Sequence, residues 1–134
     1  MIVDYNTLMP TLYHVLNVED NQDTARLIRL VLKDLPLEVH HASGGLVALE
    51  LIKQFKPDLL IVDVSLPDMH GWEVLDQLKA NGVDSQVVPV IMLTSHNEAS
   101  HRVIAKLKGV ASYMTKPFEP DELRDKVKEL LKIR

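Results

Sequence analysis

Four short apolar runs in this sequence each end at residues that could take part in phosphoryl transfer. Glu19 and Asp20 follow the first run, and Asp63 closes the second. Thr94 follows the third run, and Lys116 follows the fourth. Phosphoryl transfer depends mainly on alignment and charge neutralisation, and three carboxylates, a hydroxyl and an ammonium group can supply both. These five residues are therefore the candidate site.

A divalent cation would complete this set of residues. Three carboxylates placed close together repel one another, and at least one would resist ionisation. Mg²⁺ removes that problem, because it accepts one or two carboxylates together with waters and a phosphoryl oxygen. Asp63 is then the natural nucleophile and would form an aspartyl phosphate. Lys116 and the Thr94 hydroxyl can each contact a phosphoryl oxygen.

The elements that must position these residues follow from the hydrophobic pattern. Short apolar runs between helical patterns indicate buried parallel strands, and ligands of such sheets bind beyond the carboxyl ends of the strands. The alternation of strands and helices predicts an α/β fold, a doubly wound five-stranded parallel sheet. The predicted strands are Tyr13–Val18, Glu38–His41, Asp58–Asp63, Val88–Leu93 and Ala111–Met114.

Five helical patterns separate and follow these strands. The first helix is expected to start around the N-cap residue Asn21, and the third to follow Gly71 and stop at Asn81-Gly82. The fourth should span about Glu98 to Leu107, and the fifth should open at Pro120. The second begins after Ser43 and carries Leu46, Leu49, Ile52 and Phe55 at helical spacing. These units form one domain over residues 13–134, and residues 1–12 are expected to be a short lead-in.

Composition and charge exclude several classes of protein. The net charge of −4 argues against a nucleic-acid surface, and the absence of Cys excludes disulfides and thiolate chemistry. No apolar stretch approaches the roughly 20 residues that cross a bilayer, and the N-terminus lacks the basic cluster of a signal peptide. We therefore expect a soluble cytoplasmic protein with no nucleic-acid or membrane partner.

The six histidines do not have the spacing of a zinc site. His40 and His41 point to opposite faces of a strand, and His96 and His101 are poorly spaced for one ion. The sequence favours surface histidines instead.

Three segments in combination resemble the receiver domain of two-component response regulators. They are Val15-Leu16-Asn17-Val18-Glu19-Asp20-Asn21, Leu60–Leu75 with Asp63 and Gly71, and Tyr113-Met114-Thr115-Lys116-Pro117-Phe118. The resemblance implies that Asp63 accepts a phosphoryl group from a histidine kinase or phosphotransfer protein. It also implies that Glu19, Asp20, Asp63 and the backbone carbonyl of Ser65 hold Mg²⁺. The expected activities are self-phosphorylation and autodephosphorylation, and the chain is not expected to be an enzyme that turns over an external substrate.

The resemblance carries further expectations about structure and switching. The strand order should be 2-1-3-4-5, as in flavodoxin-like folds, with a cis peptide at Lys116-Pro117. Thr94 contacts the phosphoryl group, and Tyr113 occupies the aromatic switch position, although a strand tyrosine can also simply pack in the core. Ser65 and His96 occupy the positions that tune the phosphate lifetime.

Asn17 departs from this pattern, whereas Trp72 has a packing role. Asn17 places an amide within the first strand, and its burial would require a hydrogen-bond partner. Trp72, near Gly71, is expected to pack a helix close to the site.

Two other functions use similar residues. Haloacid-dehalogenase-type phosphatases usually have a second acid two positions after the nucleophile, where this sequence has Ser65. Nucleotide- or flavin-binding modules have a glycine-rich turn after the first strand, where this sequence has acids.

For a receiver, the phosphorylation signal should reach a downstream protein through the fourth helix, fifth strand and fifth helix. The alternative to a separate downstream protein is that this chain is a fragment of a longer regulator.

Overall fold

The computed structural model describes residues 12–95 and 99–133. Five parallel strands form one sheet in the order β2-β1-β3-β4-β5, which confirms the predicted topology. The strands are β1 (Tyr13–Val18), β2 (Leu37–Ala42), β3 (Leu59–Asp63), β4 (Val90–Thr94) and β5 (Ser112–Thr115). They lie within two residues of their predicted bounds.

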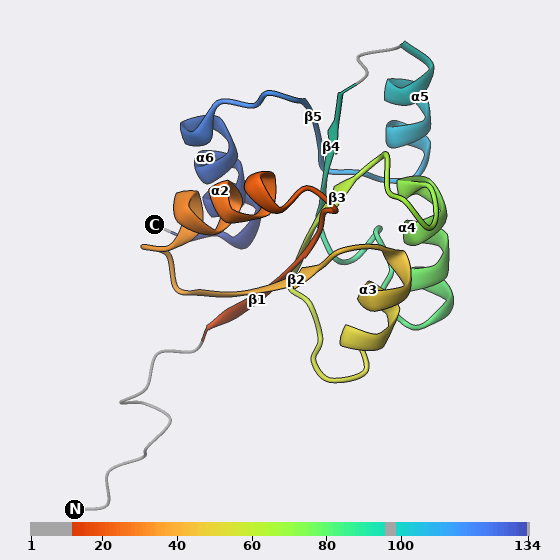
Figure 1. The fold of residues 1–134 in the computed structure, drawn as a ribbon, viewed down its shortest axis with the longest axis horizontal. Coiled ribbons are helices and arrows are strands. Elements are labelled where there is room, and N and C mark those ends of the chain that lie inside the picture. Colours follow the sequence, from red (N-terminus) through yellow and green to blue (C-terminus); the bar gives the residue numbers. More distant parts are fainter. Residues whose placement is uncertain (1–11, 96–98, 134) are drawn as a thin grey trace, which may run out of the picture.

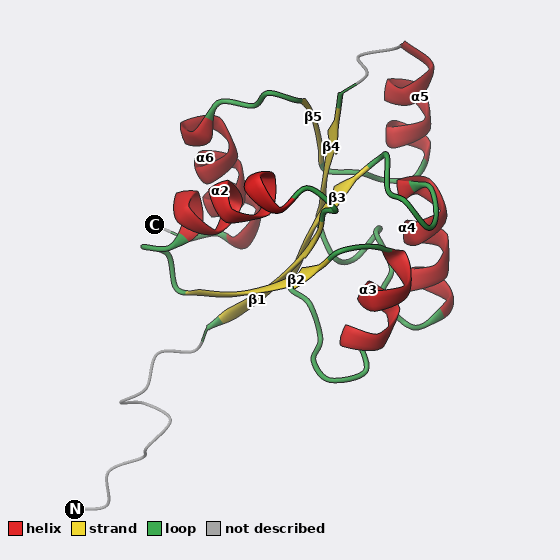
Figure 2. Cartoon of the chain, in the orientation of Figure 1, coloured by secondary structure: helices red, strands yellow, loops and turns green. Residues whose placement is uncertain are grey.

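Helices cover both faces of the sheet, as the doubly wound prediction requires (Figures 1 and 2). One face carries α2 (Gln22–Leu32) and α6 (Pro120–Leu131), and the other carries α3 (Gly45–Leu51), α4 (Gly71–Ala80) and α5 (Ala99–Leu107). Asn21 is the N-cap of α2, as predicted, because its side chain accepts the Thr24 N–H. Each helix begins within two residues of the predicted position, apart from the start expected near Glu98, which lies outside the described residues.

The sheet separates two apolar layers, and the central strands contribute to both. Every residue of β3 and β4 is buried. Leu60, Val62 and Met92 belong to the layer beneath α3, α4 and α5, which includes the buried Trp72. Leu59 and Ile61 belong to the layer beneath α2 and α6. Burial on both faces explains why these strands are continuous apolar runs rather than alternating ones.

The second helix is shorter than its apolar spacing suggests. α3 ends at Leu51, so Ile52 and Phe55 lie beyond it, although both pack against the core, and Leu46 is exposed. After α3 the chain forms a 3₁₀-type turn, in which the Lys53 N–H donates to the Glu50 carbonyl three residues earlier. Helical spacing alone could not show where the chain leaves the helix to enter β3.

Asn17 is buried in β1, and its side-chain nitrogen and oxygen have no hydrogen-bond partner within the described part of the chain. The expected partner is therefore not found, and nothing in the structure explains the amide.

None of the helices described is both long and apolar enough to cross a membrane.

Candidate functional site

The candidate site lies at the carboxyl ends of β1, β3, β4 and β5, and strand register assembles it. Val18 in β1 pairs with Val62 in β3, so the residues that follow, Glu19 and Asp63, come side by side. Asp63 in turn pairs with Leu93 of β4. Sequence order alone would leave these carboxylates far apart.

The same register brings Thr94 and Lys116 to this end of the sheet. Thr94 pairs with Thr115, and the Lys116 N–H donates to the Thr94 carbonyl at 2.7 Å. Thr94 is fully buried. The peptide bond between Lys116 and Pro117 is cis, as predicted.

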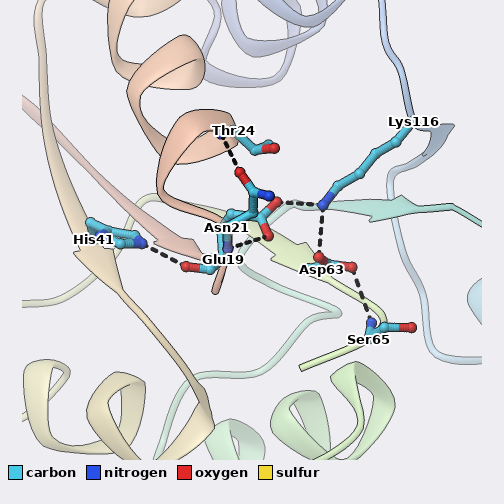
Figure 3. Close-up of polar contacts among 7 residues, drawn as sticks. All are labelled: Glu19, Asn21, Thr24, His41, Asp63, Ser65 and Lys116. Carbon is cyan, nitrogen blue, oxygen red and sulfur yellow. Dashed lines mark hydrogen bonds and ion pairs between the residues drawn. The ribbon is translucent and has the colours of Figure 1, made fainter. Parts of the chain in front are cut away.

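Lys116 bridges two buried carboxylates at the centre of the site (Figure 3). Its Nζ lies 2.6 Å from Glu19 Oε1 and 2.7 Å from Asp63 Oδ2. The side chains of Glu19 and Asp63 are only 1% and 7% exposed. Lys116 therefore lies next to Asp63, as predicted, and a small part of the Asp63 side chain remains exposed to solvent.

Asp20 completes a triad of carboxylates that could hold a cation. Glu19, Asp20 and Asp63 each offer an oxygen, and these oxygens lie within 4.8 Å of one another. Asp20 is exposed, so the triad opens to solvent on its side. When the three carboxylates and the Lys116 ammonium group are all ionised, the site has a net charge of two negative units on hard oxygen donors. This donor set fits a divalent cation such as Mg²⁺.

The loop after Asp63 is tied to the site and to α3. The Ser65 N–H donates to Asp63 Oδ1 at 3.0 Å and limits the rotation of that carboxylate. Asp68 accepts the N–H groups of Gly45 (3.0 Å) and Leu46 (2.9 Å), and the bonds from Leu46 and Gly45 lower the pKa of Asp68. Sequence reasoning missed this anchor. The signal was a helix opening at glycines, without a capping side chain of its own.

A second residue that sequence reasoning missed is His41 on the edge strand β2. Its Nε2 lies 2.6 Å from the Glu19 carbonyl oxygen (Figure 3). Because a carbonyl oxygen only accepts, His41 must carry a proton on Nε2. On the other side, the Asn21 N–H donates to Glu19 Oε2 at 3.3 Å. The backbone and the carboxylate of Glu19 are thus both held.

The predicted switch residue Tyr113 and the predicted lifetime residue Ser65 differ in burial. Tyr113 in β5 is half-buried against the apolar layer beneath α3, α4 and α5. The Arg102 guanidinium carbon lies 5.2 Å from the Tyr113 ring centroid, a cation–π distance. Ser65 is exposed, and His96 lies outside the described residues. Trp72 packs in the core at the start of α4, as expected.

Burial and charge shift the protonation of the central pair. Burial raises the pKa of Glu19 to about 7, and the neighbouring Asp63 adds to this, although the hydrogen bond from Lys116 opposes it. Burial alone would lower the pKa of Lys116, but its hydrogen bonds to Asp63 and Glu19 outweigh that effect and raise it. Lys116 therefore stays charged, whereas Glu19 can take up a proton near neutrality.

This shift predicts a pH-dependent stability in the absence of divalent metal. The native state binds the Glu19 proton more tightly than the unfolded chain, whose Glu19 has a pKa near 4.5. The free energy of unfolding should therefore fall as the pH rises from about 4.5 to about 7, by up to about 3 kcal/mol. Urea unfolding in EDTA at pH 5 and pH 8 measures it. Glu19→Gln should flatten this dependence, and an unchanged slope would contradict the assignment.

A second prediction concerns Gly71, at the first position of α4. A Cβ there would lie 2.8 Å from the Val64 Cα and closer still to the Asp63 carbonyl oxygen. Both are backbone atoms, so Gly71→Ala must displace the Asp63 segment. We expect a loss of about 1–3 kcal/mol in the free energy of unfolding and weaker Mg²⁺ binding, measured by urea unfolding and by calorimetric titration.

Gly82→Ala is the matched control for Gly71→Ala. Gly82 has φ +94°, and no atom of the described residues lies within 4 Å of the point where its Cβ would stand, so the variant strains only its own turn. It should cost about 1 kcal/mol and leave Mg²⁺ binding unchanged. Equal Mg²⁺ binding by the two variants would show that Gly71 does not position the site.

Known proteins share both the sequence pattern and the fold. The family described as "Response regulator receiver domain" matches residues 15–128. The alkaline phosphatase synthesis transcriptional regulatory protein PhoP of Bacillus subtilis is 36% identical over 88% of this chain and 48% of its own length. The response regulator MprA of Mycobacterium leprae is 33% identical over 88% of this chain and 50% of its own. The chain thus spans about half the length of these curated relatives.

Solved structures of receiver domains also match this chain. The signal receiver domain of a LuxO repressor protein from Vibrio parahaemolyticus superposes with a TM-score of 0.83 at 34% identity, covering 91% of this chain and 92% of that one. A CheY-like receiver domain protein from Methanospirillum hungatei gives 0.81 at 27%, covering 91% and 95%. These matches do not favour the phosphatase or the nucleotide-binding alternative. The chain belongs to the family of response regulator receiver domains, which act in two-component phosphorelay signalling.

Proposed function

We propose that this chain, as a receiver over residues 13–134, accepts a phosphoryl group on Asp63 in a magnesium-dependent reaction. The observation that carries the proposal is the position of Lys116 Nζ between Glu19 and Asp63, with Asp20 completing the carboxylate triad. The donor would be the phosphohistidine of a sensor kinase or phosphotransfer protein. Self-phosphorylation by small phosphodonors and autodephosphorylation belong to the same proposal.

In the proposed reaction, an Asp63 carboxylate oxygen attacks phosphorus. A P–O bond forms as the P–N bond to the donor imidazole breaks, and the ring leaves as neutral imidazole because its leaving nitrogen takes up a proton from solvent. Lys116, now paired with Asp63 Oδ2, would keep its proton and shift its ion pair to a phosphoryl oxygen, and the Ser65 N–H would hold the other carboxylate oxygen. Glu19, Asp20, Asp63 and the Ser65 carbonyl would hold Mg²⁺, which supplies charge neutralisation when bound.

We propose that phosphorylation is then transmitted through Thr94 and Tyr113. The Thr94 hydroxyl would move toward the phosphoryl group, and the Tyr113 ring would turn further into the core, leaving its contact with Arg102. Converting a mostly inactive population to a mostly active one requires about 5 kcal/mol of differential stabilisation. A buried, doubly charged group can supply that amount. Ser65 and His96 are proposed to set the lifetime of the phosphate.

The output surface is proposed to be α5, β5 and α6, where a downstream protein would bind. Val103 and Leu107 on α5 are large apolar side chains that are more than half exposed. Such exposure at the surface that Tyr113 would remodel supports a protein partner there.

Trp72 fluorescence tests the proposed function directly. The Trp72 ring is buried at the start of α4, one residue from the glycine that packs against the Asp63 backbone. Mg²⁺ followed by beryllofluoride, which mimics a phosphoryl group, should change the emission only when both are present. Asp63→Ala should abolish the response, and the exposed-acid variant Asp34→Asn should keep it. A full response in Asp63→Ala would contradict the proposal.

A further inference from the structure

Three potential metal ligands lie on one face of β1 and β2, away from the phosphoacceptor end. His14 pairs with Glu38, and His40 pairs with Leu16, which shares a face with His14. His14, Glu38 and His40 therefore project toward the α3 side of the sheet. His14 is the second residue of β1, whereas Glu19 follows the last. The two ends of one strand thus carry separate groups of ligands.

The atoms of this group converge on one point. His14 Nδ1 lies 3.0 Å from His40 Nε2. The Glu38 oxygens lie 3.7 Å from His14 Nδ1 and 4.0 Å from His40 Nε2. Two nitrogens bound to a tetrahedral Zn²⁺ at its usual bond length are about 3.3 Å apart. Small side-chain rotations would bring all three ligand atoms to that spacing.

The surroundings hold the two rings and leave the carboxylate open to water. Phe55 stacks on His40 with 3.7 Å between ring centroids and lies 5.5 Å from His14. Asp58 Oδ2 accepts the His14 backbone N–H at 2.8 Å, which fixes the start of β1. The side chains of His14 and His40 are 35% and 21% exposed, whereas that of Glu38 is 53% exposed. Stacking explains where His40 lies, but it does not explain a carboxylate facing both ring nitrogens.

We propose that His14, Glu38 and His40 bind one divalent transition-metal ion, of which Zn²⁺ is the best match. The ligands would be His14 Nδ1, His40 Nε2 and a Glu38 oxygen, with water in the remaining position. Two imidazoles and one carboxylate are a known zinc ligand set, whereas Mg²⁺ prefers oxygen donors. This site is therefore chemically distinct from the carboxylate triad at Asp63.

Binding requires a change of tautomer in one ring. In the metal-free protein the two facing nitrogens share one proton, so one ring donates and the other accepts. A metal needs a lone pair on both nitrogens. The donating ring must therefore carry its proton on its other nitrogen, and two neutral rings release no net proton. The ion would link the edge strand β2 to β1 through their side chains.

Calorimetric titration with Zn²⁺ tests the proposal, in excess Mg²⁺ so that the oxygen-ligand site is occupied. The wild-type chain should bind one Zn²⁺, and Co²⁺ should give the intense visible absorption of tetrahedral coordination. The double variant His14→Gln/His40→Gln should weaken binding at least about 100-fold, and Glu38→Gln at least about tenfold. Glu38 is exposed, so Glu38→Gln tests the site even if the double variant does not fold.

Two controls separate this site from other zinc-binding groups. His70→Gln removes a histidine outside the cluster, and Asp63→Asn removes a carboxylate of the other site. Both should bind Zn²⁺ like the wild type, so failure of this proposal is distinguishable from failure of the proposed phosphoacceptor. The absence of a one-to-one Zn²⁺ complex in the wild type would overturn the proposal. Unchanged Zn²⁺ affinity in Glu38→Gln would overturn it equally.

Discussion

Asp63→Asn should abolish phosphorylation of this chain by a small phosphodonor such as acetyl phosphate. An amide is not a competent nucleophile for phosphorus, so labelling should fall at least about 100-fold. The fold should survive, because Glu19 and Lys116 still form a neutral ion pair, 2.6 Å apart, beside the new amide. Phosphate-affinity electrophoresis or intact mass in the presence of Mg²⁺ measures the labelled fraction, and circular dichroism checks the fold.

Asp34→Asn provides the matched control for this substitution. It makes the same chemical change at an exposed acid and should be labelled like the wild type. Undiminished incorporation in Asp63→Asn would refute the assignment of the acceptor. Equal losses in both variants would indicate a nonspecific effect of the amide substitution.

Lys116→Met should strongly destabilise the metal-free protein at pH 8. It removes the ammonium group that lies within hydrogen-bonding distance of Glu19 and Asp63, whose side chains are almost fully buried. Breaking a buried ion pair from one side typically costs about 3–5 kcal/mol, because the remaining charge is uncompensated. Urea unfolding in EDTA measures the loss.

Three comparisons identify the cause of that loss. The destabilisation should shrink at pH 5, where Glu19 is protonated, and Mg²⁺ should restore part of the stability at pH 8. Lys53→Met removes an exposed lysine that pairs with Glu50 at 2.9 Å. It should cost less than about 1 kcal/mol. If the Lys53 and Lys116 variants lose equal stability, the buried triad does not contribute as proposed.

Much of the fold could be predicted from local pattern. The continuous apolar run of β3 indicates a strand covered on both faces, and the Asn21 cap marks the start of α2. Both depend on neighbours in sequence. The end of α3 could not be predicted in the same way, since it depends on where the chain must turn to enter β3.

Local sequence was enough to establish which side chains reach the carboxyl end of the sheet, because each is the last residue of its strand or follows it directly. It was sufficient to nominate Glu19, Asp63 and Lys116 and to recognise the receiver pattern. The three-dimensional arrangement was needed to show that Lys116 pairs with both acids, at 2.6 and 2.7 Å. It also showed that His14 faces His40, although the histidine spacing had argued against a zinc site. The physical reason is register: pairing between strands sets contacts between residues far apart in sequence, and no local pattern specifies it.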